Sequence, residues 1–129
     1  ANFTHYTAAA GILELRQIIA EKFKKDNNLT VEPQNILVSP GAKSSIINVL
    51  TAVCDPRDEV LIPSPFWVSY TAQVEMVDAI PIILPTEETN NFKISAKQLE
   101  KTLQNLNNPK ALILNSPNNP TGAVYNREE

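Results

Sequence analysis

The chain has 129 residues, of which 43% are hydrophobic and 19% charged, and its formal net charge is −3. These values are typical of one globular domain, and they exclude a disordered chain and a basic nucleic-acid-binding protein. No apolar run approaches the roughly 18 residues of a membrane-spanning helix, so we expect no membrane partner either. The single cysteine, Cys54, cannot form an internal disulfide, which favours a reducing, cytoplasmic compartment.

Helix-type and strand-type apolar patterns alternate along the chain. In order, they predict a helix at 11–26, a strand at 36–38, a helix at 42–53, a strand at 60–62, a helix at 67–77, a strand at 80–84, a helix that starts after Ser95, and a strand at 111–114. Ser95 and Gln98 have the spacing of a capping box. The strands are continuous apolar runs, which is typical of a parallel sheet covered on both faces. We therefore predict an α/β fold of three layers, with a mainly parallel sheet and helices on both faces.

Ligands of open parallel sheets bind beyond the carboxyl ends of the strands, and the predicted strands lead there into three unusual loops. The first, 39–45, is a glycine turn that opens a helix and carries serines and Lys43. Helix N-termini attract anions through their free N–H groups and their dipole, so this loop is a candidate phosphate cradle. An ordinary strand-to-helix turn with a serine-rich start is the alternative.

The other two loops carry the only tryptophan and a cluster of asparagines. In the loop 63–67, two prolines form a stiff corner that delivers Trp67 to the ligand edge, where an indole can stack on a flat aromatic ligand. A core tryptophan is the alternative. In the loop 115–122, an asparagine held before a proline can donate a hydrogen bond to a ligand oxygen. A turn without a ligand is the alternative there.

The loop from Asn115 to Gly122 resembles the Asn-Pro-Thr-Gly signature of class I/II aminotransferases, which have fold type I among pyridoxal phosphate enzymes. Other motifs resemble the family in the same order: Tyr6 through Gly11 to Glu14-Leu15-Arg16, Gly41-Ala42-Lys43, Asp55-Pro56, Asp58-Glu59-Val60 and Pro65-Phe66-Trp67. The resemblance spans nearly the whole chain and is closest to bacterial-type aspartate aminotransferases. Ala42, Arg57 and Phe66 depart from the family pattern, where glycine, glycine and tyrosine are commoner.

The resemblance implies that residues 1–129 are the N-terminal part of the large domain, which binds pyridoxal 5′-phosphate, and that the rest of this domain and the small domain are absent. It assigns the following contacts: Gly41, Ala42 and Lys43 with the cofactor phosphate, Trp67 with the pyridine ring, Asn119 with the phenolic oxygen, Tyr6 with the phosphate in the partner subunit's site, and Lys43, Trp67 and Asn119 with the substrate. Tyr6 thereby implies a homodimer. Lys43 favours aspartate or glutamate, with a 2-oxo acid as the second substrate.

The resemblance assigns no catalytic residue to this chain. The lysine that forms a Schiff base with the cofactor, together with the aspartate and arginine of the later motifs, would lie beyond Glu129. The ends agree with a piece of a longer protein, because the chain starts with Ala1 and residues 126–129 look like the start of a helix. Two alternatives stay open: another fold type I enzyme, such as a carbon–sulfur lyase or a different transaminase, and a non-catalytic module with a cofactor-phosphate site.

Several structural expectations follow. The Ser64–Pro65 and Asn119–Pro120 bonds should be cis, and Tyr6 should lie outside the body of its own subunit. Met76 should belong to the core. In the family sheet later strands insert between those present here, so the strand at 60–62 should not pair directly with the strand at 111–114, nor should the strand at 36–38.

Overall fold

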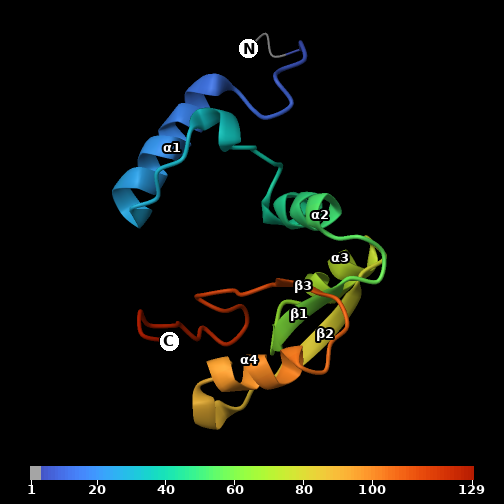
Figure 1. Ribbon diagram of the computed structural model, residues 1–129. Helices are drawn as coiled ribbons and strands as arrows, with labels where there is room; N and C mark the ends of the chain where they lie inside the picture. Colours follow the sequence, from blue (N-terminus) through green and yellow to red (C-terminus); the bar gives the residue numbers. More distant parts are fainter. Residues whose placement is uncertain (1–3) are drawn as a thin grey trace. The chain divides into compact units, whose positions relative to one another are not determined.

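The computed structural model describes residues 4–129, which form helices and three strands (Figure 1). The chain divides into two compact units, Ala1–Ser45 and Ile46–Glu129. None of the helices within the described residues has the length and the apolar character needed to cross a bilayer.

The first unit contains α1 (Leu13–Asn27) and the short 3₁₀ helix η1 (Pro33–Asn35). The helix α1 agrees with the predicted helix at 11–26. It ends because Asn28 adopts the left-handed conformation, with φ of 54°, and its N–H donates to the carbonyl of Phe23. Asparagine is one of the few residues that tolerates this conformation, and it closes the helix by satisfying a carbonyl of the last turn.

Gly11 and Arg16 hold the first unit together. Gly11 has φ of +97°, and a Cβ placed on it would lie 2.9 Å from Cβ of Val38. Arg16 donates from Nε to the Gly11 carbonyl and from Nη1 to the Pro33 carbonyl, both at 3.1 Å. Gly11 and Arg16 of the first motif therefore have a structural role, because their contacts join the segment before α1 to the segments that follow it.

The strand predicted at 36–38 was wrong, because these residues are not in a strand. The segment makes one backbone hydrogen bond to the chain before α1, from the Val38 N–H to the Ala10 carbonyl at 3.0 Å. Leu37 is 59% exposed. A short apolar run has the composition of a strand, but it becomes one only where a neighbouring strand supplies a hydrogen-bond ladder.

The second unit contains a parallel sheet of three strands in the order β2-β1-β3. Its strands are β1 (Glu59–Ser64), β2 (Ile80–Pro85) and β3 (Pro109–Leu112). The expectation that the strand at 60–62 would not pair with the strand at 111–114 was wrong, because Val60 is opposite Ala111 and Leu61 is opposite Leu112. The reason is burial: Val60, Leu61 and Ile62 are buried, so the backbone of β1 needs hydrogen-bond partners on both sides.

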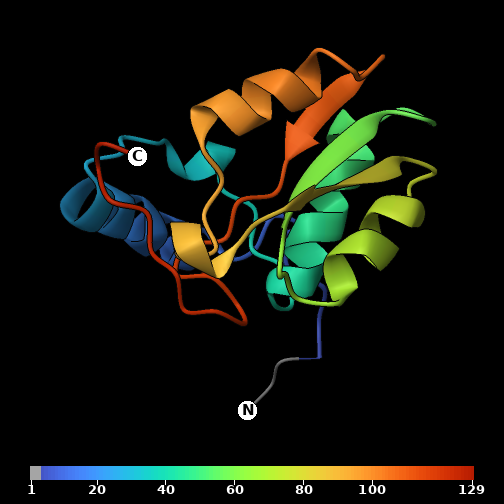
Figure 2. The same ribbon diagram turned by 90° about the horizontal axis from the view of Figure 1, so that it is seen from below.

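The helices of the second unit cover the sheet on both faces. They are α2 (Ala42–Val53, from Ile46 onward), α3 (Ser69–Glu75) and α4 (Ala96–Leu103), with the 3₁₀ helix η2 (Glu88–Asn90) before α4. Figures 1 and 2 show α3 and α4 on opposite sides of the strands. The core cluster consists of Leu50, Val60, Ile62, Tyr70, Val74 and Ala79. The α/β class with a parallel sheet, predicted from the sequence, is confirmed.

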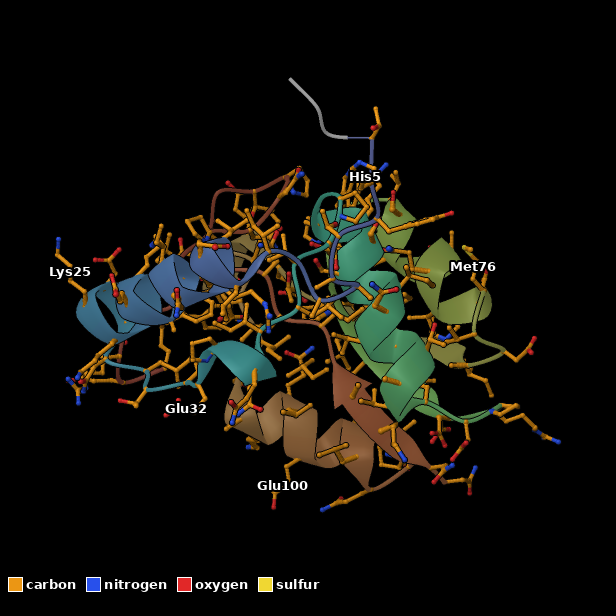
Figure 3. All side chains as sticks on the ribbon, turned by 90° about the horizontal axis from the view of Figure 1, so that it is seen from above. His5, Lys25, Glu32, Met76 and Glu100 are labelled. Atoms are coloured by element: carbon orange, nitrogen blue, oxygen red, sulfur yellow. The ribbon has the colours of Figure 1, made fainter. Side chains whose placement is uncertain are left out.

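Local predictions for this unit had mixed outcomes. Ser95 caps α4 as expected, because its Oγ accepts a hydrogen bond from the N–H of Gln98 at 3.2 Å. The Ser64–Pro65 and Asn119–Pro120 bonds are cis as expected, and Ser116–Pro117 is a third cis bond that was not expected. The core assignment of Met76 was wrong: the residue is 73% exposed, since α3 ends one residue before it and turns it outward (Figure 3).

A buried polar cluster joins β1 and β3 at the ends where both strands begin. Asp58, only 2% exposed, accepts hydrogen bonds from the Asp55 N–H at 2.8 Å and from Nδ2 of Asn108. The register shift between β1 and β3 leaves Lys110 without an opposite residue in the strand pairing. Its Nζ lies 3.6 Å from the Asp58 carboxylate. Burial, and then the charge of Asp58, raise the pKa of the Cys54 thiol, while Lys110 lowers it. Cys54 is therefore a protonated thiol of low reactivity at neutral pH.

We expect Gly11→Ala to destabilise the protein by about 2–4 kcal/mol, because it adds an unfavourable positive φ and a clash with Val38. Gly122→Ala is the matched control: its φ is +74°, but nothing lies within 4 Å of the added Cβ. This control should cost only about 1–2 kcal/mol, the backbone term alone. Urea unfolding followed by circular dichroism measures both. Equal losses in the two variants would contradict the close contact at Gly11.

Candidate functional site

The loops that follow β1 and β3 meet at one edge of the sheet. Because the strands are parallel neighbours, both carboxyl ends emerge on the same side. Nδ2 of Asn118, in the loop after β3, donates to the carbonyl of Pro65, in the loop after β1, at 3.1 Å. Two of the three loops predicted from the sequence are therefore in direct contact.

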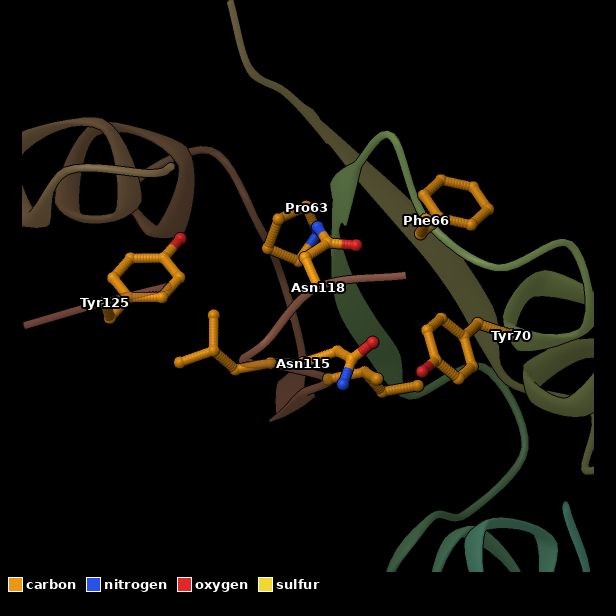
Figure 4. Close-up of a pocket in the computed structure, with 8 residues that line it drawn as sticks. Pro63, Phe66, Tyr70, Asn115, Asn118 and Tyr125 are labelled. Carbon is orange, nitrogen blue, oxygen red and sulfur yellow. The ribbon is translucent and has the colours of Figure 1, made fainter. Parts of the chain in front are cut away.

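A small hollow lies between these loops (Figure 4). Its lining residues are Pro63, Phe66, Tyr70, Ile113, Leu114, Asn115, Asn118 and Tyr125. In Figure 4, Asn115 and Asn118 lie between Tyr125 on one side and Phe66 and Tyr70 on the other. The hollow has room for about one water molecule, so it is a gap inside the loop packing rather than a chamber for a cofactor.

The backbone of the asparagine loop is held by its own hydrogen bonds. Asn118 donates its N–H to the Ala123 carbonyl at 2.9 Å and accepts from the Gly122 N–H at 2.8 Å. Oδ1 of Asn115 accepts from the Asn119 N–H at 2.9 Å. Asn115 and Asn118 were not among the site residues predicted from the sequence, although their density in the loop was the available signal.

Asn118 and Asn119 have opposite environments. The side chain of Asn118 is directed into the protein, where its buried Oδ1 has no hydrogen-bond partner among the described residues. A buried acceptor without a partner costs about 1–3 kcal/mol, so this oxygen is a place where a donor from water or ligand would be stabilised. Asn119 is exposed, and within residues 4–129 its side chain makes no hydrogen bond. The amide of Asn119 is therefore exposed at the edge of the loop, and its contact with a ligand stays a prediction.

Trp67 is half-buried and packs against the core cluster. Its ring meets the ring of Tyr70 edge-on, with centroids 5.7 Å apart and planes at 83°. The alternative of a core tryptophan thus describes part of its environment. The same packing fixes the orientation of the indole, which is what a stacking surface for a flat ligand requires.

The third predicted loop opens α2 as expected. Gly41 has φ of +92°, with nothing within 4 Å of where a Cβ would lie, and α2 begins at Ala42. The first turn of α2 contains Lys43 and no acidic residue. The hydroxyls of Ser44 and Ser45 are directed back to the carbonyls of Pro40 and Gly41, at 3.4 and 3.5 Å. The start of α2 is therefore open at Gly41 and carries no acidic residue, and phosphate binding there stays a prediction.

The remaining predicted contact, Tyr6, is fully exposed on this chain, and its position toward a partner subunit stays a prediction. Tyr6, Gly41, Ala42 and Lys43 belong to the first unit, whereas Trp67 and Asn119 belong to the second. Within the second unit, the loops of Trp67 and Asn119 are therefore in contact. The predicted phosphate loop, Gly41 to Lys43, belongs to the other unit. Within residues 4–129 no three His, Cys, Asp or Glu side chains are grouped as metal ligands would be.

Sheet and loops place the chain in the class of α/β proteins whose ligands bind at the carboxyl edge of a parallel sheet. Comparison with known proteins narrows this class, because the family model for aminotransferase class I and II matches residues 1–129. The chain belongs to the class I and II aminotransferase family.

Relatives in this family are similar along almost the whole chain. A bifunctional aspartate aminotransferase and glutamate/aspartate-prephenate aminotransferase from Petunia hybrida is 50% identical, over 97% of this chain and 26% of its own length. The aspartate aminotransferase of Bacillus subtilis (strain 168) is 43% identical, over 98% of this chain and 32% of its own length. The crystal structure of an aromatic aminotransferase from Pyrococcus horikoshii OT3 matches with a TM-score of 0.91 at 40% identity, over 97% of this chain and 33% of its own. The chain spans about a third or less of each of these proteins.

Replacing the two neighbouring asparagines separately should distinguish structural from ligand-binding roles. Asn118→Ala removes the hydrogen bond to Pro65, and we expect it to lower the free energy of unfolding by about 1 kcal/mol. Asn119→Ala removes an exposed amide and should change stability by less than about 0.5 kcal/mol. Urea unfolding at 25 °C measures both values. A larger loss in Asn119→Ala than in Asn118→Ala would contradict this assignment.

Proposed function

We propose that the protein containing this chain is a pyridoxal-phosphate-dependent aminotransferase that moves an amino group between aspartate or glutamate and a 2-oxo acid. The observation that carries the proposal is the asparagine loop of a chain that belongs to this family. Asn118 anchors the loop, and the side chain of Asn119 is exposed beside it. Enzymes of this family generally depend on pyridoxal phosphate. When bound, that cofactor supplies the electron sink for the reaction.

The described residues fit the cofactor by their chemistry. Gly41 leaves open space at the start of α2, where a dianionic phosphate is favoured by the backbone N–H groups of Ala42 and Lys43. Trp67 offers an oriented aromatic face for the pyridine ring. Asn119 offers a donor for the phenolic oxygen. Each of these properties supports the roles that the sequence motifs imply.

The proposed parent is larger than this chain, since the relatives above are about three to four times as long. We place the lysine that reacts with the cofactor, its partner aspartate and the substrate-binding arginine in that remainder. The parent is proposed to be a homodimer, in which Tyr6 reaches the phosphate of the neighbouring site. Its exposed ring supports this role. The half-buried free thiol of Cys54 supports a reducing compartment, and we propose the cytoplasm.

Titration of the full-length protein with pyridoxal phosphate, followed by its absorbance, tests the cofactor. A coupled assay with aspartate and 2-oxoglutarate tests the reaction. We expect saturable binding and amino transfer. Binding without transfer from any amino acid, but with release of a thiol or sulfide from a sulfur amino acid, would instead favour the carbon–sulfur lyase alternative. No binding at all would refute the proposal.

Lys43→Ala in the full-length enzyme should lower kcat/KM for aspartate by roughly 10- to 100-fold, because a carboxylate of the substrate loses a charge-assisted partner. The kcat/KM for phenylalanine should change much less. Cofactor affinity is measured in parallel, since Lys43 is also proposed to contact the phosphate. Lys25→Ala, on the exposed end of α1, is the charge-matched control. Equal losses for both substrates would mean that Lys43 does not select acidic side chains.

The chain of residues 1–129 alone should show no amino transfer, even with excess cofactor. Covalent catalysis needs a lysine of lowered pKa that faces the cofactor aldehyde, and the family lysine is not among the motifs of this chain. Mixing the chain with the remainder of its parent should restore activity if the two parts associate. Borohydride trapping of the cofactor on one specific lysine of this chain would overturn the expectation.

A further inference from the structure

Tyr125 joins the asparagine loop to the start of α4. Its hydroxyl accepts a hydrogen bond from the Ile94 N–H at 2.9 Å, and its own N–H donates to Oγ of Ser116 at 3.2 Å. Ile94 directly precedes Ser95, the residue that caps α4. Tyr125 therefore connects both limbs of the loop, at residue 116 and just after residue 122, to a separate element of the second unit.

Lys93 strengthens this connection from the other side. Its Nζ donates to the carbonyl of Val124 at 3.3 Å and lies 5.8 Å from the centroid of the Tyr125 ring. The side chain of Lys93 is only 16% exposed, and its Nζ also forms an ion pair with Glu129 at 2.6 Å. Two neighbouring residues before α4 thus hold two neighbouring residues after the loop. We name this arrangement of Lys93, Ile94, Val124 and Tyr125 the loop strap.

The loop strap matters because the orientation of the Asn119 side chain depends on the position of the loop backbone. The side chain of Asn119 is exposed and makes no hydrogen bond among the described residues, so no packing orients it. Upstream, the loop is held by Asn115 and Asn118. Downstream of Gly122, the loop strap supplies the contacts to another element, at Val124 and Tyr125. A ligand contact has to be held within about 0.5 Å of its productive position, so both limbs of the loop need support.

We infer that Tyr125 is a positioning residue for Asn119, which it holds in place through the backbone of the asparagine loop. The inference rests on the proposed function, since it concerns the contact of Asn119 with the cofactor. The ring of Tyr125 lines the hollow beside Asn115 and Asn118, so its aromatic body packs the loop while its hydroxyl fixes the distance to α4 (Figure 4).

Tyr125→Phe in the full-length protein isolates the hydroxyl, because the ring is kept and the Ile94 N–H loses its acceptor. We expect the dissociation constant of pyridoxal phosphate, measured by absorbance titration, to rise roughly three- to tenfold, the range set by one lost hydrogen bond. Ser95→Ala is the matched control: it removes a helix cap next to Ile94 with a comparable loss of stability, but it leaves the loop strap in place. The affinity of this control should stay within about twofold of wild type.

A double-mutant cycle tests whether the effect passes through Asn119. In an Asn119→Ala background, Tyr125→Phe should have no further effect on affinity, because the contact that it positions is already gone. Additive losses would overturn the positioning role. So would an equal loss of affinity in Ser95→Ala and Tyr125→Phe, because that result would indicate general destabilisation instead.

Hydrogen exchange on the cofactor-free protein separates the loop strap from the proposed function. Peptides covering 115–125 should exchange faster in Tyr125→Phe than in wild type or Ser95→Ala, and unchanged exchange would overturn the inference. If the wild-type protein binds no pyridoxal phosphate, the proposed function fails and the positioning role fails with it. Faster exchange in Tyr125→Phe would then still establish the loop strap as a contact of the fold.

Discussion

The direct pairing of β1 with β3 is the constraint on which the rest of the second unit depends. The middle of β1 is fully buried, so its backbone polar groups must be satisfied on both edges, by β2 and by β3. Because all three strands are parallel, this requirement also brings the loops after β1 and β3 to the same edge of the sheet. The contact between Asn118 and Pro65 is therefore a consequence of how a buried strand is satisfied.

That edge shows how a loop can be held by internal hydrogen bonds and still present an exposed amide. Asn118 turns inward and joins the two loops, whereas the side chain of Asn119 is exposed and makes no hydrogen bond within residues 4–129. The same residue type thus has opposite environments at adjacent positions. Anchors at Asn115 and Tyr125 support the backbone on either side, so the exposed amide does not need packing of its own.

Several residues of the family motifs make their contacts inside the fold. Gly11 and Arg16 carry the first motif, yet their contacts are with Val38 and with the Gly11 and Pro33 carbonyls inside the first unit. Asp58, from the Asp58-Glu59-Val60 motif, is buried and hydrogen-bonded where β1 begins, at the end of the strand opposite the candidate site. Membership of a family motif therefore does not by itself place a residue in the candidate site.

Sequence alone determined what depends on neighbours along the chain. Helix periodicity located α1 and α2, the Ser95 cap started α4, and the motifs named Gly41, Trp67 and Asn119. Tertiary structure decided what depends on distant partners. Three expectations failed for this reason. Residues 36–38 have a strand's composition but lack a hydrogen-bond ladder, and Met76 lies on an outer surface. The strands β1 and β3 pair directly, although 48 residues lie between the two predicted strands. Nor does any local pattern indicate that Tyr125 meets Ile94, because that hydrogen bond joins residues 31 positions apart, and only the packed chain brings them together.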